Sequence, residues 1–108
     1  MHKMMVLAKA APGRAEELAR WYDERHINDL LAVPGFVSAE RHAVIPLKQP
    51  DGTPQWDFML IYEIAGDPLE VMRGMGSLMG SEKMPSSDAL ESVSTISVIG
   101  MSQGRREG

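Results

Sequence analysis

Residues 55–64 read Gln-Trp-Asp-Phe-Met-Leu-Ile-Tyr-Glu-Ile, and apolar side chains occupy both odd and even positions of this stretch. Successive side chains of a β-strand point to opposite faces of its sheet. One face of a strand here would carry Trp56, Phe58, Leu60, Tyr62 and Ile64. Met59 and Ile61 would lie on the opposite face. We therefore predict a strand that is covered on both faces.

Three further strands are expected around this one. Residues 4–10, 36–45 and 92–101 are short segments rich in apolar or β-branched side chains. The loop between the second and third strands contains three prolines, Pro46, Pro50 and Pro54. Proline has no backbone N–H and cannot donate a hydrogen bond to a neighbouring strand, so neither strand can continue through this segment. We therefore expect the two strands to form an antiparallel pair joined by a long loop.

Two helices are expected between the strands. Residues 14–31 are rich in Ala, Glu, Arg and Leu, which are good helix formers. Asp67 and Pro68 are typical of the N-cap and first position of a helix, here over residues 69–79. The order of elements predicts an α+β protein with the ferredoxin-like βαββαβ fold. In this fold a four-stranded antiparallel sheet carries both helices on one face.

The second face of the sheet has no cover within the chain. The first and last strands are apolar on both faces, as residues 55–64 are, and the two helices cover only one face. Residues 1–101 are expected to form one domain and residues 102–108 a polar, flexible tail. We therefore predict a homodimer in which two sheets pair face to face.

The composition excludes several kinds of site and partner. The 108 residues carry a net charge of −4 and include no Cys. The absence of Cys excludes disulfides, thiol catalysis, Cys-bound zinc and iron–sulfur clusters. The acidic balance argues against nucleic acid as a partner. No apolar run approaches the roughly 20 residues of a transmembrane helix. We expect a cytoplasmic protein that binds neither nucleic acid nor membranes.

His26 is the leading candidate for chemistry. At about 100° per residue it falls in the apolar stripe of the first helix, with Tyr22 one turn before it and Asp29 one turn after it. A desolvated imidazole can act as base or acid, and Asp29 could orient it. The alternative is a structural His26 that hydrogen-bonds only a backbone carbonyl. Because Ile27 and Leu31 lie off the stripe, we expect the helix to bend or end soon after His26.

Polar residues of the second strand are further candidates. Ser38, Glu40 and His42 share one face and Arg41 lies on the other, although an edge strand facing water would explain them without a function. The substrate contacts that we expect are Arg41, His42, Trp21, Phe36 and Met59. Met72, Met75 and Met79 follow helical spacing, and we interpret them as core residues rather than soft-metal ligands.

Motifs of common metal and cofactor enzymes are absent from the sequence. It contains no H-E-x-x-H, no G-x-G-x-x-G, no G-x-x-x-x-G-K-[ST] and no G-x-S-x-G. Zinc hydrolysis, dinucleotide redox chemistry, phosphoryl transfer and serine hydrolysis therefore lack support. We expect no metal and no cofactor, which leaves acid–base chemistry or binding.

Residues 21–26, Trp-Tyr-Asp-Glu-Arg-His, and residues 29–36, Asp-Leu-Leu-Ala-Val-Pro-Gly-Phe, resemble the dimeric α/β-barrel superfamily and most closely its EthD-type domains. In these domains an aromatic residue precedes a helical His by one turn, and a Pro-Gly segment opens the second strand. The resemblance implies a barrel-like dimer with a cleft between sheet and helices in each subunit. His26 would line this cleft, with Tyr22 and Asp29 near it. Haem enzymes of the superfamily generally take their axial His from the second helical region, which has no His here.

Members of the superfamily include polyketide cyclases, lactone isomerases and cofactor-independent monooxygenases. We expect a small cofactor-independent enzyme of cyclase, isomerase or lyase type that acts on an apolar aromatic or polyketide-like molecule. His26 would move a proton, Asp29 would orient it, and Tyr22 or Arg41 would polarise an oxygen. One alternative is a cofactor-free monooxygenase of quinols or phenols. Another is a non-catalytic module that binds a small molecule.

Overall fold

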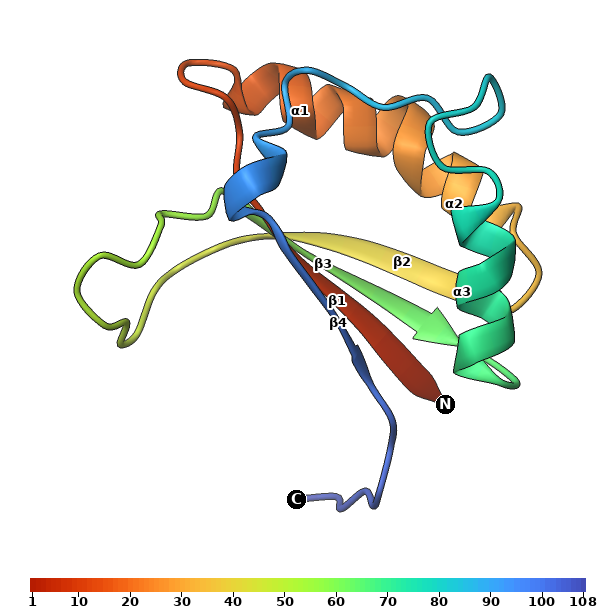
Figure 1. The fold of residues 1–108 in the computed structure, drawn as a ribbon. Helices are drawn as coiled ribbons and strands as arrows, with labels where there is room; N and C mark the ends of the chain where they lie inside the picture. Colours follow the sequence, from red (N-terminus) through yellow and green to blue (C-terminus); the bar gives the residue numbers. More distant parts are fainter.

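A four-stranded antiparallel sheet with helices on one face forms the protein, seen in a computed structural model that describes residues 1–108 (Figure 1). The elements are β1 (His2–Ala8), α1 (Ala15–Trp21), η1 (Tyr22–His26), α2 (Ile27–Leu31), β2 (Phe36–Ala43), β3 (Phe58–Ile64), α3 (Pro68–Gly76), η2 (Ser92–Ser94) and β4 (Ile96–Gly100). The predicted α+β ferredoxin-like fold is confirmed. None of the helices combines the length and apolar composition needed to cross a bilayer.

The strand order β2-β3-β1-β4 places β3 and β1 at the centre of the sheet. β1 pairs with β3 so that Met4 faces Tyr62 and Val6 faces Leu60. These four side chains are buried under the helices, whereas Met59 and Ile61 on the other face are only half-buried. The two-sided pattern predicted for residues 55–64 is therefore confirmed, and the second face is uncovered within the chain.

The helix predicted over residues 14–31 is confirmed, because α1, η1 and α2 run without interruption from Ala15 to Leu31. It does not end soon after His26, as the off-stripe positions of Ile27 and Leu31 had suggested. Its middle part, η1, is π-helical, and a π turn contains more residues than an α turn. The buried positions therefore recur every four residues at Leu18, Tyr22, His26 and Leu30. Leu30 thus takes the inward position that the α-helical period assigned to Asp29.

The observed ends of β2, β3 and α3 differ from the predicted ends by a few residues. β2 ends at Ala43 and β3 begins at Phe58, so the proline-containing loop is longer than predicted. α3 begins as expected: the Asp67 carboxylate accepts a hydrogen bond from the Leu69 backbone N–H at 3.0 Å. It ends at Gly76, three residues before the predicted end.

The core lies between the sheet and the helices and consists of one cluster of 15 buried hydrophobic residues. Tyr62, Leu60 and Ile64 of β3 contribute completely buried side chains to it. His26 is the one buried polar or charged residue of the protein, with 9% of its surface exposed. The fold therefore brings a single imidazole into a mostly apolar interior.

Candidate functional site

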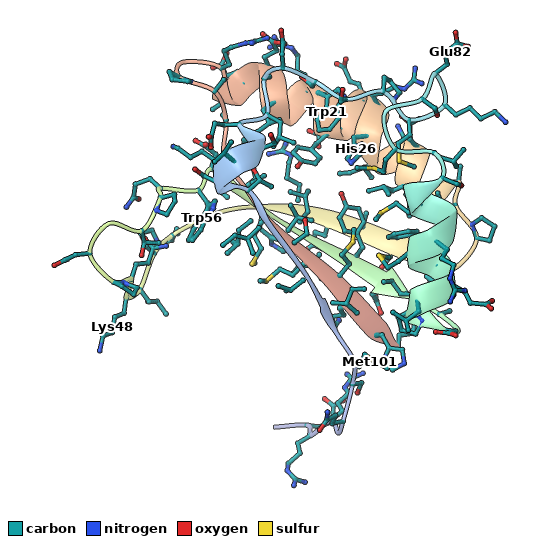
Figure 2. All side chains as sticks on the ribbon, in the orientation of Figure 1. Trp21, His26, Lys48, Trp56, Glu82 and Met101 are labelled. Atoms are coloured by element: carbon teal, nitrogen blue, oxygen red, sulfur yellow. The ribbon has the colours of Figure 1, made fainter.

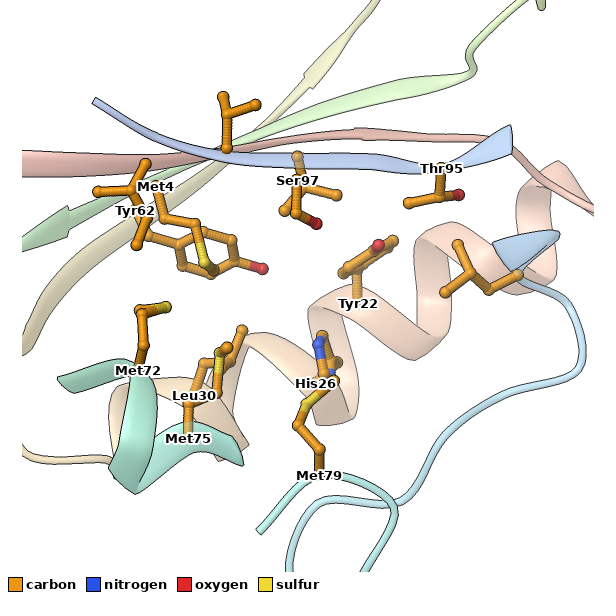
Figure 3. A pocket seen from close by; sticks show the side chains of 14 residues that line it. Met4, Tyr22, His26, Leu30, Tyr62, Met72, Met75, Met79, Thr95 and Ser97 are labelled. Atoms are coloured by element: carbon orange, nitrogen blue, oxygen red, sulfur yellow. The ribbon is translucent and has the colours of Figure 1, made fainter. Parts of the chain in front are cut away.

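A cavity of about 420 Å³ lies between the sheet and the helices (Figure 3). Eleven of its 14 lining residues are hydrophobic, with the rings of Tyr22 and Tyr62 counted among them. Its apolar wall includes Met4, Val6, Leu30, Met72, Met75 and Met79, and its polar lining is Tyr22, His26, Tyr62, Thr95 and Ser97. Ser97 of β4 and Met79 in the turn after α3 are exposed residues of its lining. The predicted cleft between sheet and helices is present, and His26 and Tyr22 line it.

Aromatic contacts fix the orientation of the His26 ring. The ring stacks on Trp21 with 4.3 Å between centroids and 16° between planes, and Tyr22 meets it edge-on at 5.6 Å. Trp21 and His26 lie side by side on the long helix (Figure 2). The Nδ1 atom of His26 is fully buried and has no hydrogen-bond partner. A structural His26 bonded through Nδ1 to a backbone carbonyl is thus not what the structure contains.

Burial keeps the imidazole neutral. It lowers the pKa of His26 to about 4, and the nearby Asp29 carboxylate, which acts in the opposite direction, compensates only in part. At pH 7 the ring therefore carries no charge and retains a nitrogen lone pair that can accept a proton.

Asp29 does not hydrogen-bond His26, which corrects our expectation that it orients the ring. Its Oδ2 atom instead accepts a hydrogen bond from Arg25 Nε at 2.8 Å. Arg25 also donates to the Glu82 carbonyl at 2.8 Å and so links the helix to the loop after α3. The π turn explains the difference, because it turns Asp29 away from the cavity.

Two tyrosines supply the other polar groups deep in the cavity. Burial raises the pKa of Tyr22 to about 12. Burial, and secondarily the neighbouring Tyr22, raises the pKa of Tyr62 further above its usual range. Both hydroxyls are therefore protonated donors at pH 7. Tyr62 was not among the predicted site residues; strand alternation grouped it with Leu60 and Ile64 but did not indicate that the helices cover this face.

The predicted substrate contacts, Trp21 among them, do not line the cavity. Arg41 donates to the Asp23 carboxylate at 2.7 and 2.9 Å, and its guanidinium lies 4.8 Å from the centre of the Phe58 ring. Hydrogen bonding to Arg41 lowers the pKa of Asp23 and raises that of Arg41. The cavity thus lacks the guanidinium that we expected.

Three other predicted contacts also lie elsewhere. His42 and Met59 are paired neighbours on the uncovered face of the sheet, and His42 Nε2 lies 2.9 Å from Glu40. Phe36 is a core residue that packs edge-on against Tyr62 at 5.7 Å. Strand alternation places His42 and Met59 on the face of the sheet opposite His26, whereas Phe36 lies on the same side as His26 but behind Tyr62 in the core.

The methionines predicted as core residues form part of the cavity wall. Met72, Met75 and Met79 line one side of it, opposite the sheet (Figure 3). Methionine side chains are flexible and polarisable, so this wall can adapt to ligands of different shape. No group of three or more His, Asp or Glu side chains is arranged to hold a metal ion.

No protein-family model matches the chain, and neither does any curated protein. Three solved structures are similar to it. The first is a mutant of MhuD with two manganese protoporphyrin IX molecules bound per active site, with a TM-score of 0.59, 10% identity and full coverage of both chains. The second is a candidate monooxygenase from Shewanella loihica PV-4, with a TM-score of 0.59, 13% identity and coverage of 96% of this chain and 95% of that one.

The third similar structure is an ethyl tert-butyl ether D (EthD) family protein from Bacillus halodurans C-125. Its TM-score is 0.55, with 13% identity and coverage of 95% of this chain and all of that one. These similarities extend over nearly the whole chain and concern the fold. The resemblance to EthD-type domains read from residues 21–36 is thus confirmed at the level of the fold.

Proposed function

We propose that the chain is an enzyme that binds an uncharged, apolar aromatic or polyketide-like molecule in the cavity, where His26 exchanges a proton with it. The observation that carries this proposal is one neutral imidazole, without a hydrogen-bond partner at Nδ1, in the wall of a mostly apolar cavity. A buried polar group that lacks a partner costs free energy and is rare in folded proteins. A ligand with an acidic proton would give the imidazole its partner.

The charge of the lining supports an uncharged ligand. None of the residues around the cavity is Lys, Arg, Asp or Glu. Protoporphyrin, bound by one of the similar structures, carries two carboxylates, and the lining offers no cation to neutralise them. The residues of this cavity therefore do not fit a porphyrin, and no step of the proposed chemistry requires one.

His26 would act as the base. It would accept a proton from a phenolic hydroxyl or an enolisable carbon of the ligand, and the resulting imidazolium would be stabilised by the adjacent ligand anion and by the Asp29 carboxylate. The Tyr22 hydroxyl would donate to the oxygen on which charge develops. The anion could then cyclise, isomerise or eliminate a group.

Replacing His26 by Gln tests this role. We expect His26→Gln to lower kcat/KM about 100-fold or more, because general acid–base catalysis contributes roughly 10²–10⁴-fold. Ligand affinity should change only a few-fold. The measurement is product formation from a panel of hydroxylated naphthalenes and enolisable aromatic ketones, followed by mass spectrometry. His2→Gln is the matched control, because His2 lies at the start of β1 and does not line the cavity.

Two results would contradict the role of His26. Unchanged turnover in His26→Gln would show that the imidazole moves no proton. Tight binding of many panel members without conversion of any would favour the non-catalytic alternative.

A second candidate function is oxidation of a quinol or phenol by O₂ in the same cavity. The similarity to a candidate monooxygenase supports it, and its first step, removal of a proton by His26, is the same. Oxygen consumption separates the two functions, because a cyclase, isomerase or lyase uses none. An oxygen electrode in the same assay distinguishes them.

We further infer that two copies of the chain pair through the uncovered sheet face. Met5, Leu7, Met59 and Ile61 form a half-buried apolar patch on this face, and Val98 of β4 extends it with 46% of its surface exposed. Apolar patches of this kind usually mark an interface. A second copy would bury the patch without requiring another partner.

A charged substitution in this patch should separate the copies. We expect the wild-type chain to sediment at twice its mass of 11.9 kDa and Ile61→Lys to sediment as a monomer, because burying an unpaired charge at the interface is costly. Ile45→Lys is the control, since Ile45 is 85% exposed in the loop after β2. A wild-type monomer at micromolar concentration would refute the inferred dimer.

A further inference from the structure

The hydroxyl of Tyr62 is a second unpartnered polar group of the cavity. Tyr62 lies in β3 at the centre of the sheet, and its side chain is completely buried. Its hydroxyl oxygen has no hydrogen-bond partner in the protein. Figure 3 shows this hydroxyl pointing along the cavity toward Tyr22. A buried hydroxyl of this kind, aimed into a cavity, is a position where a ligand atom can bind.

The chemistry of the hydroxyl defines the ligand atom. Burial raises the pKa of Tyr62 and that of Tyr22, so both phenols remain protonated and can donate hydrogen bonds throughout the physiological range. The complementary ligand group is an acceptor oxygen, such as a carbonyl or a hydroxyl. Close packing holds the ring of Tyr62 in this orientation, because the side chain is completely buried and Phe36 packs edge-on against it at 5.7 Å.

His26 and Tyr62 come from different sides of the cavity. His26 extends from the helix that covers the sheet, and Tyr62 extends from the sheet itself. The wall between and around them is apolar, with Leu30, Met4 and Met75 contributing to it. A ligand that satisfies both groups must therefore carry polar atoms at two separate positions of an apolar frame.

We propose that Tyr62 is the specificity-determining residue of the cavity, and that it donates a hydrogen bond to a second oxygen of the ligand while His26 meets the first. The inference rests on the proposed function and deepens it by naming the substrate class. That class is an uncharged aromatic molecule with two oxygens at separate positions, such as a quinol or a hydroxylated aromatic ketone. An analogue without the second oxygen would leave the Tyr62 hydroxyl unpaired and bind less tightly.

Binding of naphthalene derivatives tests this inference without knowledge of the natural substrate. The probes are 1-naphthol and a set of dihydroxynaphthalenes, the 1,5-, 1,6-, 2,6- and 2,7-isomers, measured by calorimetry against the intact wild-type chain and Tyr62→Phe. We expect at least one isomer to bind the wild type about tenfold more tightly than 1-naphthol does. Tyr62→Phe keeps the ring and its packing, so it should abolish this preference and leave the affinity for 1-naphthol nearly unchanged.

The outcomes separate this inference from the proposed function. A preference that persists in Tyr62→Phe, or the absence of any preference in the wild type while 1-naphthol still binds, overturns the role of Tyr62 alone. Binding of none of the compounds overturns it together with the proposed ligand class.

A readout on the wild type does not depend on how Tyr62→Phe folds. The carbonyl stretch of bound 5-hydroxy-1-tetralone should lie below its frequency in an apolar solvent if the carbonyl oxygen accepts a hydrogen bond. An unshifted stretch in the bound state overturns the inference.

Discussion

Gly35→Ala is expected to destabilise the protein by about 2–5 kcal/mol and to lower Tm by roughly 10–30 °C. Gly35 has a φ of +101°, a backbone conformation that residues other than Gly rarely adopt. A Cβ atom here would lie 2.2 Å from Cγ2 of Val71 in α3 and 3.3 Å from the Ala65 carbonyl oxygen. The substitution therefore adds a steric clash to a conformational penalty. Thermal unfolding followed by circular dichroism measures the loss of stability that the two effects cause together.

Gly52→Ala is the matched control for this prediction. Gly52 has a φ of +82°, but a Cβ atom there would have nothing within 4 Å. Only the conformational penalty remains, so we expect a loss of about 1 kcal/mol. Equal melting temperatures for the two variants would show that contact between α3 and the segment before β2 is not tight.

The stability of the protein should fall as the pH decreases from about 6.5 to 4 because of His26. The pKa of His26 is about 4 in the folded protein, compared with about 6.5 in an unfolded chain. Between these values the unfolded state binds more protons, so protonation favours unfolding. The contribution of the neutral ring is fully present above pH 6.5, and about 3 kcal/mol of it is lost by pH 4.

Chemical denaturation of wild type and His26→Gln across this pH range measures the effect. The Gln side chain does not titrate, so its stability should fall less steeply, and the difference between the two curves isolates His26 from the carboxylates that both proteins share. The slope matters rather than the absolute stability, because Gln also alters packing. Parallel curves would contradict a buried, neutral His26 in the folded protein.

The fold could be predicted from local patterns because each pattern has a direct physical meaning. Alternation along residues 55–64 correctly placed Leu60 and Tyr62 on one face and Met59 on the other, but only the structure shows that the helices cover the face of Leu60 and Tyr62. Asp67 and Pro68 correctly located the start of α3, since an N-cap side chain and a fixed proline φ act within one turn. Strand ends were less predictable, because they depend on pairing with distant residues.

The site was predictable only in part. The helical period identified His26 and Tyr22 as inward residues, and both line the cavity. The same period wrongly placed Asp29 beside them, because a regular α-helical repeat does not include the π turn at η1. Arg41 was expected at the site, but the carboxylate of Asp23, 18 positions away in the sequence, holds its guanidinium outside the cavity.

The sequence by itself determined the element order, the two-sided sheet and the inward-facing histidine, since these follow from side-chain periodicity within single elements. The tertiary structure alone decided which polar groups meet. His26 and Tyr62 are 36 positions apart in the sequence, and only the packing of the helix on the sheet brings both to one cavity. The same packing removes hydrogen-bond partners from their polar atoms and lowers the pKa of His26, because burial depends on every element that surrounds a residue.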